Sequence, residues 1–123
     1  MIQIDWKSGV PAYDQIVSGI SRLAVLGVLP EGTQLPSVRS FALKLGVNPN
    51  TVQKAYLILE GKGITYSVAG KGSFIAANEN AKEEIKRGAK AALIKAVKNA
   101  KNAGLNKEEL SEIINDIYLK EEE

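Results

Sequence analysis

The chain has 123 residues, 45% of them apolar and 24% charged, with a formal net charge of +2, a composition that suits one globular core. It contains neither cysteine nor histidine, which excludes disulfides, thiolate chemistry and the usual zinc ligands and predicts a cytoplasmic protein without metal or cofactor. The first residues lack the pattern of a secretion signal, and no apolar run approaches the ~20 residues that span a bilayer, so we expect no membrane partner.

The charge is distributed unevenly along the chain. Residues 1–77 carry a net charge of +3, residues 78–103 carry +4 and residues 104–123 carry −5. The basic and acidic segments are either two solvated helical faces or surfaces that attract each other.

The first predicted element is an amphipathic helix that begins near Val10-Pro11. Pro suits the first turn of a helix, and apolar residues then recur with a period of 3.6: Tyr13, Ile16, Val17, Ile20, Leu23 and Ala24. Gly27, Pro30 and Gly32 end the pattern and predict a loop.

Two further helices follow at close spacing. Ser37 is a suitable N-cap for a short helix that Gly46 ends. Asn48-Pro49 is a second start signal, a cap followed by Pro at the first helical position. The third helix carries its apolar side chains at Val52, Ala55, Tyr56 and Leu59 and ends near Gly61 and Gly63. The turn between the second and third helices is therefore only residues 46–48.

The apolar period changes to two after Gly63. Ile64, Tyr66 and Val68 fall on one face of a strand, and a glycine-flanked turn leads to a second strand through Phe74. This pattern predicts a short β-hairpin.

The C-terminal segment is predicted to form two helices. The first runs from about residue 79 to Gly104, with apolar residues at Ile85, Ala89, Leu93, Ala96, Val97 and Ala100. The second has a complete start signal: Asn106 and Glu109 form a capping box, and Leu105 and Leu110 form a hydrophobic staple.

The element order helix, short helix, tight turn, longer helix and hairpin is that of a winged helix-turn-helix. The predicted fold class is mainly α with a small β-hairpin. We expect a winged helix-turn-helix over residues 1–77 and a helical dimerisation region over residues 78–123. In such a module the third helix presents its N-terminal turn to the major groove and the hairpin tip reaches the flanking DNA. An unrelated helical domain with a hairpin is the alternative.

The candidate DNA-binding residues are polar or basic side chains and glycines on these elements. Arginine has the fork geometry that fits a phosphate or a guanine, and neutral side chains at a helix start suit base edges or phosphates. Lysine suits phosphates, and glycine lets the backbone approach DNA closely. The set is Ser37, Arg39, Lys44, Asn48, Asn50, Thr51, Gln53, Lys54, Gly70, Lys71 and Gly72. Their alternative roles are helix capping, solvated charge and a flexible turn.

A family resemblance lies in residues 32–64, whose sequence is GTQLPSVRSFALKLGVNPNTVQKAYLILEGKGI. It resembles the DNA-binding domain of the GntR family of bacterial transcriptional regulators. The matching positions are Leu35-Pro36-Ser37, Arg39, Phe41-Ala42, Leu45-Gly46-Val47, Thr51-Val52, Ala55-Tyr56, Leu59-Glu60, Gly63 and Ile64. The resemblance covers roughly residues 10–76, and the remaining chain is similar to the small YtrA-like subgroup.

This resemblance implies that Arg39 contacts a base. Pro49 stands where many relatives carry Arg or Ser, and its side chain donates no hydrogen bond. We therefore expect base readout to depend more on Asn50, Gln53 and Arg39.

The apolar stripe of the last helix is larger than one neighbouring helix requires. It predicts a second copy of the chain as partner, with intramolecular packing as the alternative. The predicted dimerisation residues are Leu93, Ala96, Val97, Leu110, Ile113, Ile114 and Ile117. A two-fold dimer would bind an inverted repeat with half-sites ~10 bp apart.

The predicted function is a sequence-specific transcriptional regulator, a homodimeric repressor whose partners are double-stranded operator DNA and a second copy. Resemblance to the YtrA-like subgroup suggests ABC transporter operons as targets; the effector stays unknown. The alternative is a winged-helix protein–protein module without DNA binding, which would not require the polar face of Arg39, Asn50 and Gln53. Enzymatic activity is disfavoured, because the sequence has no His or Cys and no carboxylate pair in an apolar setting.

Overall fold

The computed structural model describes residues 2–76 and 79–122. The chain divides into two compact units, Met1–Ile85 and Lys86–Glu123. The boundary that the sequence predicts, at residues 77 and 78, lies outside the described residues.

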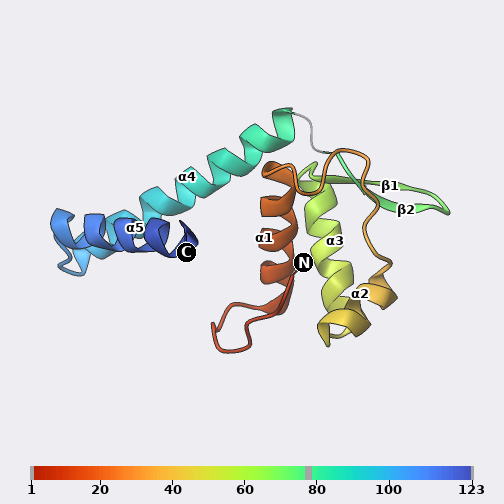
Figure 1. Ribbon diagram of the computed structural model, residues 1–123, viewed down its shortest axis with the longest axis horizontal. Helices are drawn as coiled ribbons and strands as arrows, with labels where there is room; N and C mark the ends of the chain where they lie inside the picture. The colour runs from red at the N-terminus through yellow and green to blue at the C-terminus, as the bar shows by residue number, and fades with distance from the viewer. Residues whose placement is uncertain (1, 77–78, 123) are drawn as a thin grey trace. The chain divides into compact units, whose positions relative to one another are not determined.

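The described residues form five helices and a two-stranded antiparallel sheet, as the sequence predicts. The first unit contains α1 (Ala12–Val25), α2 (Val38–Leu45), α3 (Pro49–Gly61), β1 (Thr65–Val68) and β2 (Gly72–Ile75), and α4 (Glu79–Asn102) begins there. Figure 1 shows α1 beside α3, with α2 against the N-terminal part of α3 and the hairpin extending from the opposite end. This is a winged helix-turn-helix.

Local signals fix the helix-turn-helix. The Oγ of Ser37 accepts a 3.1 Å hydrogen bond from the backbone N–H of Ser40 and caps α2. Gly46 ends α2 in the left-handed conformation, with φ of 73°. The Oδ1 of Asn48 then accepts a 2.8 Å bond from the backbone N–H of Asn50, and Pro49 occupies the first turn of α3. The predicted caps and the tight turn are confirmed.

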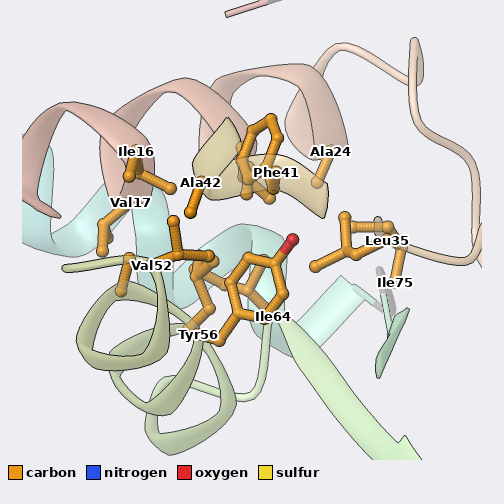
Figure 2. Close-up of a cluster of buried hydrophobic side chains, with 13 residues drawn as sticks. Ile16, Val17, Ala24, Leu35, Phe41, Ala42, Val52, Tyr56, Ile64 and Ile75 are labelled. Atoms are coloured by element: carbon orange, nitrogen blue, oxygen red, sulfur yellow. The ribbon is translucent and has the colours of Figure 1, made fainter. Parts of the chain in front are cut away.

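The hydrophobic core of the first unit lies between the three helices and the base of the hairpin. Its largest fully buried side chains come from all of these elements and from the connection after α3: Ile16, Ile20, Phe41, Val52, Leu59, Ile64 and Ile75. Figure 2 shows this cluster, with Leu35 beside Ile75 and Tyr56 beside Ile64. The core therefore ties α2 and α3 to the hairpin.

The predicted hairpin forms, but Ile64 lies ahead of its first strand and is not part of the alternation with Tyr66 and Val68. Its register pairs Thr65 with Ile75 and Tyr66 with Phe74. Thr65 is buried with Ile75, whereas Tyr66 and Val68 are exposed. Ile64 is buried ahead of the strand, so the alternation does not run from Ile64 through Val68 as one buried face.

A third chain segment pairs with the hairpin. The backbone N–H groups of Gly32 and Leu35 donate to the carbonyl oxygens of Ile75 and Ser73, and the N–H of Ile75 donates to that of Thr33, each at 2.8 Å. Gln34 forms an isolated antiparallel bridge with Phe74. The segment that the sequence predicts as a loop thus lies along the edge of β2.

The second unit contains most of α4 and α5 (Lys107–Glu122). The predicted capping box is confirmed: the N–H of Asn106 donates to Glu109 Oε1 at 3.1 Å, and the N–H of Glu109 donates to Asn106 Oδ1 at 2.8 Å. From Lys86 to Asn99 every side chain is exposed. In the described part of the chain, no helix is both long and apolar enough to cross a bilayer.

Candidate nucleic-acid interface

The N-caps and first turns of α2 and α3 carry five of the eleven predicted DNA-binding residues. Ser37 and Arg39 lie at the start of α2 and are exposed. Asn48 and Asn50 lie at the start of α3 and are exposed as well. Because α2 packs directly on α3, the fold brings these two helix starts into one helix-turn-helix.

In the first turns of α3 the outward side chains are mostly polar, whereas its inner face belongs to the core. Asn50 and Gln53 are exposed and Thr51 is half-buried, whereas Val52 and Ala55 are fully buried. Pro49 occupies the first turn and contributes only its backbone geometry. α3 therefore presents neutral hydrogen-bonding side chains outward from a rigid support.

The electrostatics of the two helix starts favour an anion. A helix N-terminus carries a partial positive charge, and the first turns of α2 and α3, both within the described residues, contain no acidic residue. Arg39 and Lys44 add full positive charges on α2. Neither of these two first turns therefore offers a carboxylate that would repel a phosphate.

Lys54 has a defined position on α3. Its ammonium group lies over the ring of Tyr13 on α1, 3.9 Å from the ring centroid. This distance is typical of a cation–π contact. The sequence identifies Lys54 as a candidate phosphate contact but does not reveal its contact with Tyr13.

The tip of the hairpin is a tight turn with a glycine on each side of Lys71. The N–H of Lys71 donates a 2.9 Å hydrogen bond to the carbonyl oxygen of Val68. Gly70 and Gly72 adopt φ values of 75° and 114°, which side chains disfavour. The Lys71 side chain is exposed between them, so the tip combines one positive charge with accessible backbone.

Tyr56 links α3 to the start of α2. Its hydroxyl donates a 2.8 Å hydrogen bond to the carbonyl oxygen of Pro36, directly before the N-cap Ser37. Figure 2 shows this hydroxyl pointing toward Leu35. Burial raises the pKa of the Tyr56 phenol above its ordinary value, so the hydroxyl keeps its proton, and with it this bond, to a higher pH than an exposed tyrosine would. Sequence reasoning assigns Tyr56 to the core and misses the bond.

The profile of bacterial regulatory proteins of the gntR family matches residues 12–75, from α1 to the end of the hairpin. The chain belongs to the GntR family. Members are DNA-binding transcriptional regulators and not enzymes, in agreement with the expectation from the sequence.

The similarity to individual relatives extends beyond this segment. The HTH-type transcriptional repressor YtrA of Bacillus subtilis is 40% identical over 121 residues, which cover 95% of this chain and 92% of the relative. A transcriptional antiterminator from Listeria monocytogenes has a similar structure, with a TM-score of 0.79, 37% identity and coverage of 96% of this chain and 90% of that one. Similarity to YtrA-type regulators therefore extends through the C-terminal helices.

A third comparison concerns DNA. The DNA-binding domain of AraR, solved in complex with an operator, matches with a TM-score of 0.56 and 27% identity, over 60% of this chain and 94% of that one. The part of this GntR-family chain that matches a DNA-bound domain is thus about the size of its winged helix-turn-helix unit.

The predicted dimerisation residues lie on α4 and α5 of the second unit. Leu93 on α4 is 56% exposed, and Ile114 and Ile117 on α5 are 47% and 54% exposed. Ala96, Val97 and Ile113 are exposed and Leu110 is half-buried. Within the described residues of this unit, the apolar stripe is therefore only partly covered.

Among the described residues, no three carboxylate, histidine or cysteine side chains are grouped so that they could hold a metal ion.

Proposed function

We propose that this GntR-family protein is a homodimeric repressor that binds an inverted-repeat operator. Residues 1–77 would form the DNA-binding domain and residues 78–123 the dimerisation region. The observation that carries the proposal is the set of exposed polar side chains at the starts of α2 and α3, where neither first turn contains an acidic side chain. Such a face suits the phosphates and base edges of DNA.

In this proposal the DNA-binding residues form two groups, which differ in the part of the DNA that they contact. Arg39, Asn50 and Gln53 contact base edges in the major groove, because their donors and acceptors match those edges. The remaining residues contact phosphates or the flanking groove: Ser37, Lys44, Asn48, Thr51, Lys54, Gly70, Lys71 and Gly72. Ser37 and Asn48 also cap their helices, so their contacts with DNA would add to an existing structural role.

A second copy of the chain is the proposed partner of α4 and α5. A soluble helix with exposed leucine and isoleucine along one stripe gains stability when another surface covers that stripe. The dimerisation residues Leu93, Ala96, Val97, Leu110, Ile113, Ile114 and Ile117 supply such a stripe on each copy. A two-fold axis through these helices would present two winged domains to the two halves of an inverted repeat.

Similarity to relatives supports repression, as opposed to activation, and suggests the target genes. YtrA of Bacillus subtilis, which is described as a repressor, matches nearly the full chain. We extend repression to this protein and propose that it acts in the cytoplasm on an ABC transporter operon, as the YtrA-like resemblance suggests.

The decisive experiment is a gel-shift titration on the DNA upstream of its own gene, with a scrambled sequence of equal length as control. A dimer that makes ~6–10 phosphate contacts should lose ~10³-fold or more in affinity between about 50 and 200 mM salt. Specific binding with this salt dependence supports the proposal. Absent or salt-independent binding contradicts it and favours the winged-helix protein–protein module.

A further inference from the structure

Gln34 contacts the wing tip, although it lies in neither the hairpin nor the helix-turn-helix. Its Nε2 donates a 2.7 Å hydrogen bond to the carbonyl oxygen of Lys71. Only the amide nitrogen of glutamine can donate to a carbonyl, so this contact fixes the orientation of the side chain. The bond joins residues 37 positions apart in the sequence. Its acceptor belongs to Lys71, whose side chain carries the positive charge at the tip.

The backbone that carries Gln34 is held firmly at both neighbouring residues. The N–H of Ile75 donates to the carbonyl of Thr33, and the N–H of Leu35 donates to the carbonyl of Ser73, each at 2.8 Å. The side chain of Leu35 is 5% exposed and belongs to the core. Gln34 therefore extends toward the tip from a fixed strand edge and not from a mobile loop.

The tip accommodates the Gln34 amide through Gly72. A Cβ atom at Gly72 would lie 3.2 Å from Gln34 Nε2, and the φ of this glycine is 114°. A side chain there would meet both a steric and a conformational penalty. The glycine that lets the tip approach DNA thus also leaves space for the amide that contacts it.

The same short segment also contacts α3 and α2. Two residues after Gln34, the carbonyl of Pro36 accepts the hydrogen bond from Tyr56 on α3. The next residue, Ser37, caps α2. Residues 34–37 therefore contact the wing tip, α3 and α2 in succession.

We propose that Gln34 is a positioning residue for DNA binding: it holds the wing tip at a fixed place relative to α2 and α3. An isolated two-stranded hairpin is only marginally ordered, and ordering a loop on binding costs affinity. The Gln34 bond removes part of that cost before DNA arrives. This inference rests on the proposed function, since it assigns the tip a role on the operator.

The substitution Gln34→Met tests the proposal, because it keeps the length and neutrality of the side chain and removes the donor. Loss of one preorganising hydrogen bond should weaken operator binding by about 3- to 10-fold. Gln3→Met is the matched control, since Gln3 is an exposed glutamine on the N-terminal segment. It should bind as the wild type does.

A double-mutant cycle with Lys71→Ala separates positioning from direct contact. If Gln34 acts by placing the Lys71 charge, the double variant binds about as weakly as Lys71→Ala alone, because the positioned side chain is already gone. Losses that add fully would show that Gln34 does not act through the Lys71 side chain and would overturn the proposal.

A third readout uses the free protein. In the wild type, ¹⁵N relaxation of Gly70, Lys71 and Gly72 should give order parameters near the ~0.85 of rigid backbone, and Gln34→Met should lower them toward ~0.6. Unchanged values overturn the positioning role. If the wild type binds the operator and Gln34→Met binds equally well, the inference fails and the proposed function stands. If the wild type binds no DNA, the proposed function fails, and the DNA-binding role of Gln34 fails with it.

Discussion

The ammonium group of Lys54 lies 3.9 Å from the centroid of the Tyr13 ring, so a cation–π contact joins α3 to α1 in addition to the core that the two helices share. Lys54 is exposed and Tyr13 is half-buried. The ring limits where this lysine can place its charge. A phosphate contact by Lys54 would therefore start from a defined position beside α1.

Replacement of Tyr13 by Leu should lower the free energy of unfolding by about 0.5–1 kcal/mol beyond the loss of ring packing, because the cation–π contact disappears. Tyr13→Phe keeps the ring face and should stay within about 0.5 kcal/mol of the wild type. Urea unfolding of both variants, each also combined with Lys54→Met, measures the coupling. A coupling near zero for Tyr13 and Lys54 would show that the contact contributes nothing to stability.

Gly46 and Gly61 provide a matched pair of glycine substitutions. Gly46 has a φ of 73° with open space around its Cα, so Gly46→Ala should destabilise through backbone strain alone, by about 1–2 kcal/mol. Gly61 ends α3 with no positive φ and equally open space, so Gly61→Ala should stabilise by about 0.5–1 kcal/mol. Urea midpoints decide this prediction, and equal effects of the two substitutions would contradict it.

Sequence reasoning predicts the helices, their caps and the hairpin because each depends on residues near one another in the chain. Ser37, Gly46 and Asn48 act within one turn of their own positions. The same locality brings the candidate residues of α2 and α3 into one helix-turn-helix.

The contacts that sequence reasoning misses are long-range. The bonds from Gln34 to Lys71 and from Tyr56 to Pro36 span 37 and 20 residues. Their partners are backbone carbonyls, which every residue type carries, so no sequence pattern marks them. The pairing of residues 32–35 with β2 is missed for a similar reason, since this segment has the Gly and Pro content of a loop.

The hydroxyl of Tyr56 predicts a pH dependence of stability. Burial raises its pKa in the folded state, whereas an unfolded tyrosine titrates near 10. The folded state then holds the proton more tightly, so the contribution of Tyr56 is fully present below about pH 10 and falls as the pH rises above it.

Urea unfolding of the wild type and Tyr56→Phe at about pH 8 and pH 11 measures this effect. At the lower pH the wild type should be more stable by about 1 kcal/mol, because the variant loses the bond to Pro36. The difference should shrink or reverse at the higher pH. The other tyrosines are common to both proteins and cancel, so a constant difference would contradict the predicted titration.

Arg39→Ala should weaken specific operator binding by ~1–3 kcal/mol and spare the fold, because the side chain is exposed at the start of α2. Arg39→Lys keeps the charge but not the two-pronged donor, so it should recover non-specific binding more than specific binding. Competition gel shifts with operator and scrambled DNA distinguish the two effects. A variant that retains the wild-type preference for operator over scrambled DNA would exclude a base contact by Arg39.

The apolar stripe of α5 predicts which substitutions weaken the dimer. Ile114 and Ile117 are about half exposed in the single chain, at 47% and 54%. If a second copy covers them, Ile114→Lys or Ile117→Lys buries a charge on each side of a two-fold interface and should raise the dimer dissociation constant by roughly 100-fold or more. Asn115→Lys adds the same charge at an exposed polar position of the same helix and should leave the dimer intact. Sedimentation equilibrium measures all three variants; a monomeric wild type, or equal effects of Ile114→Lys and Asn115→Lys, would place the interface elsewhere.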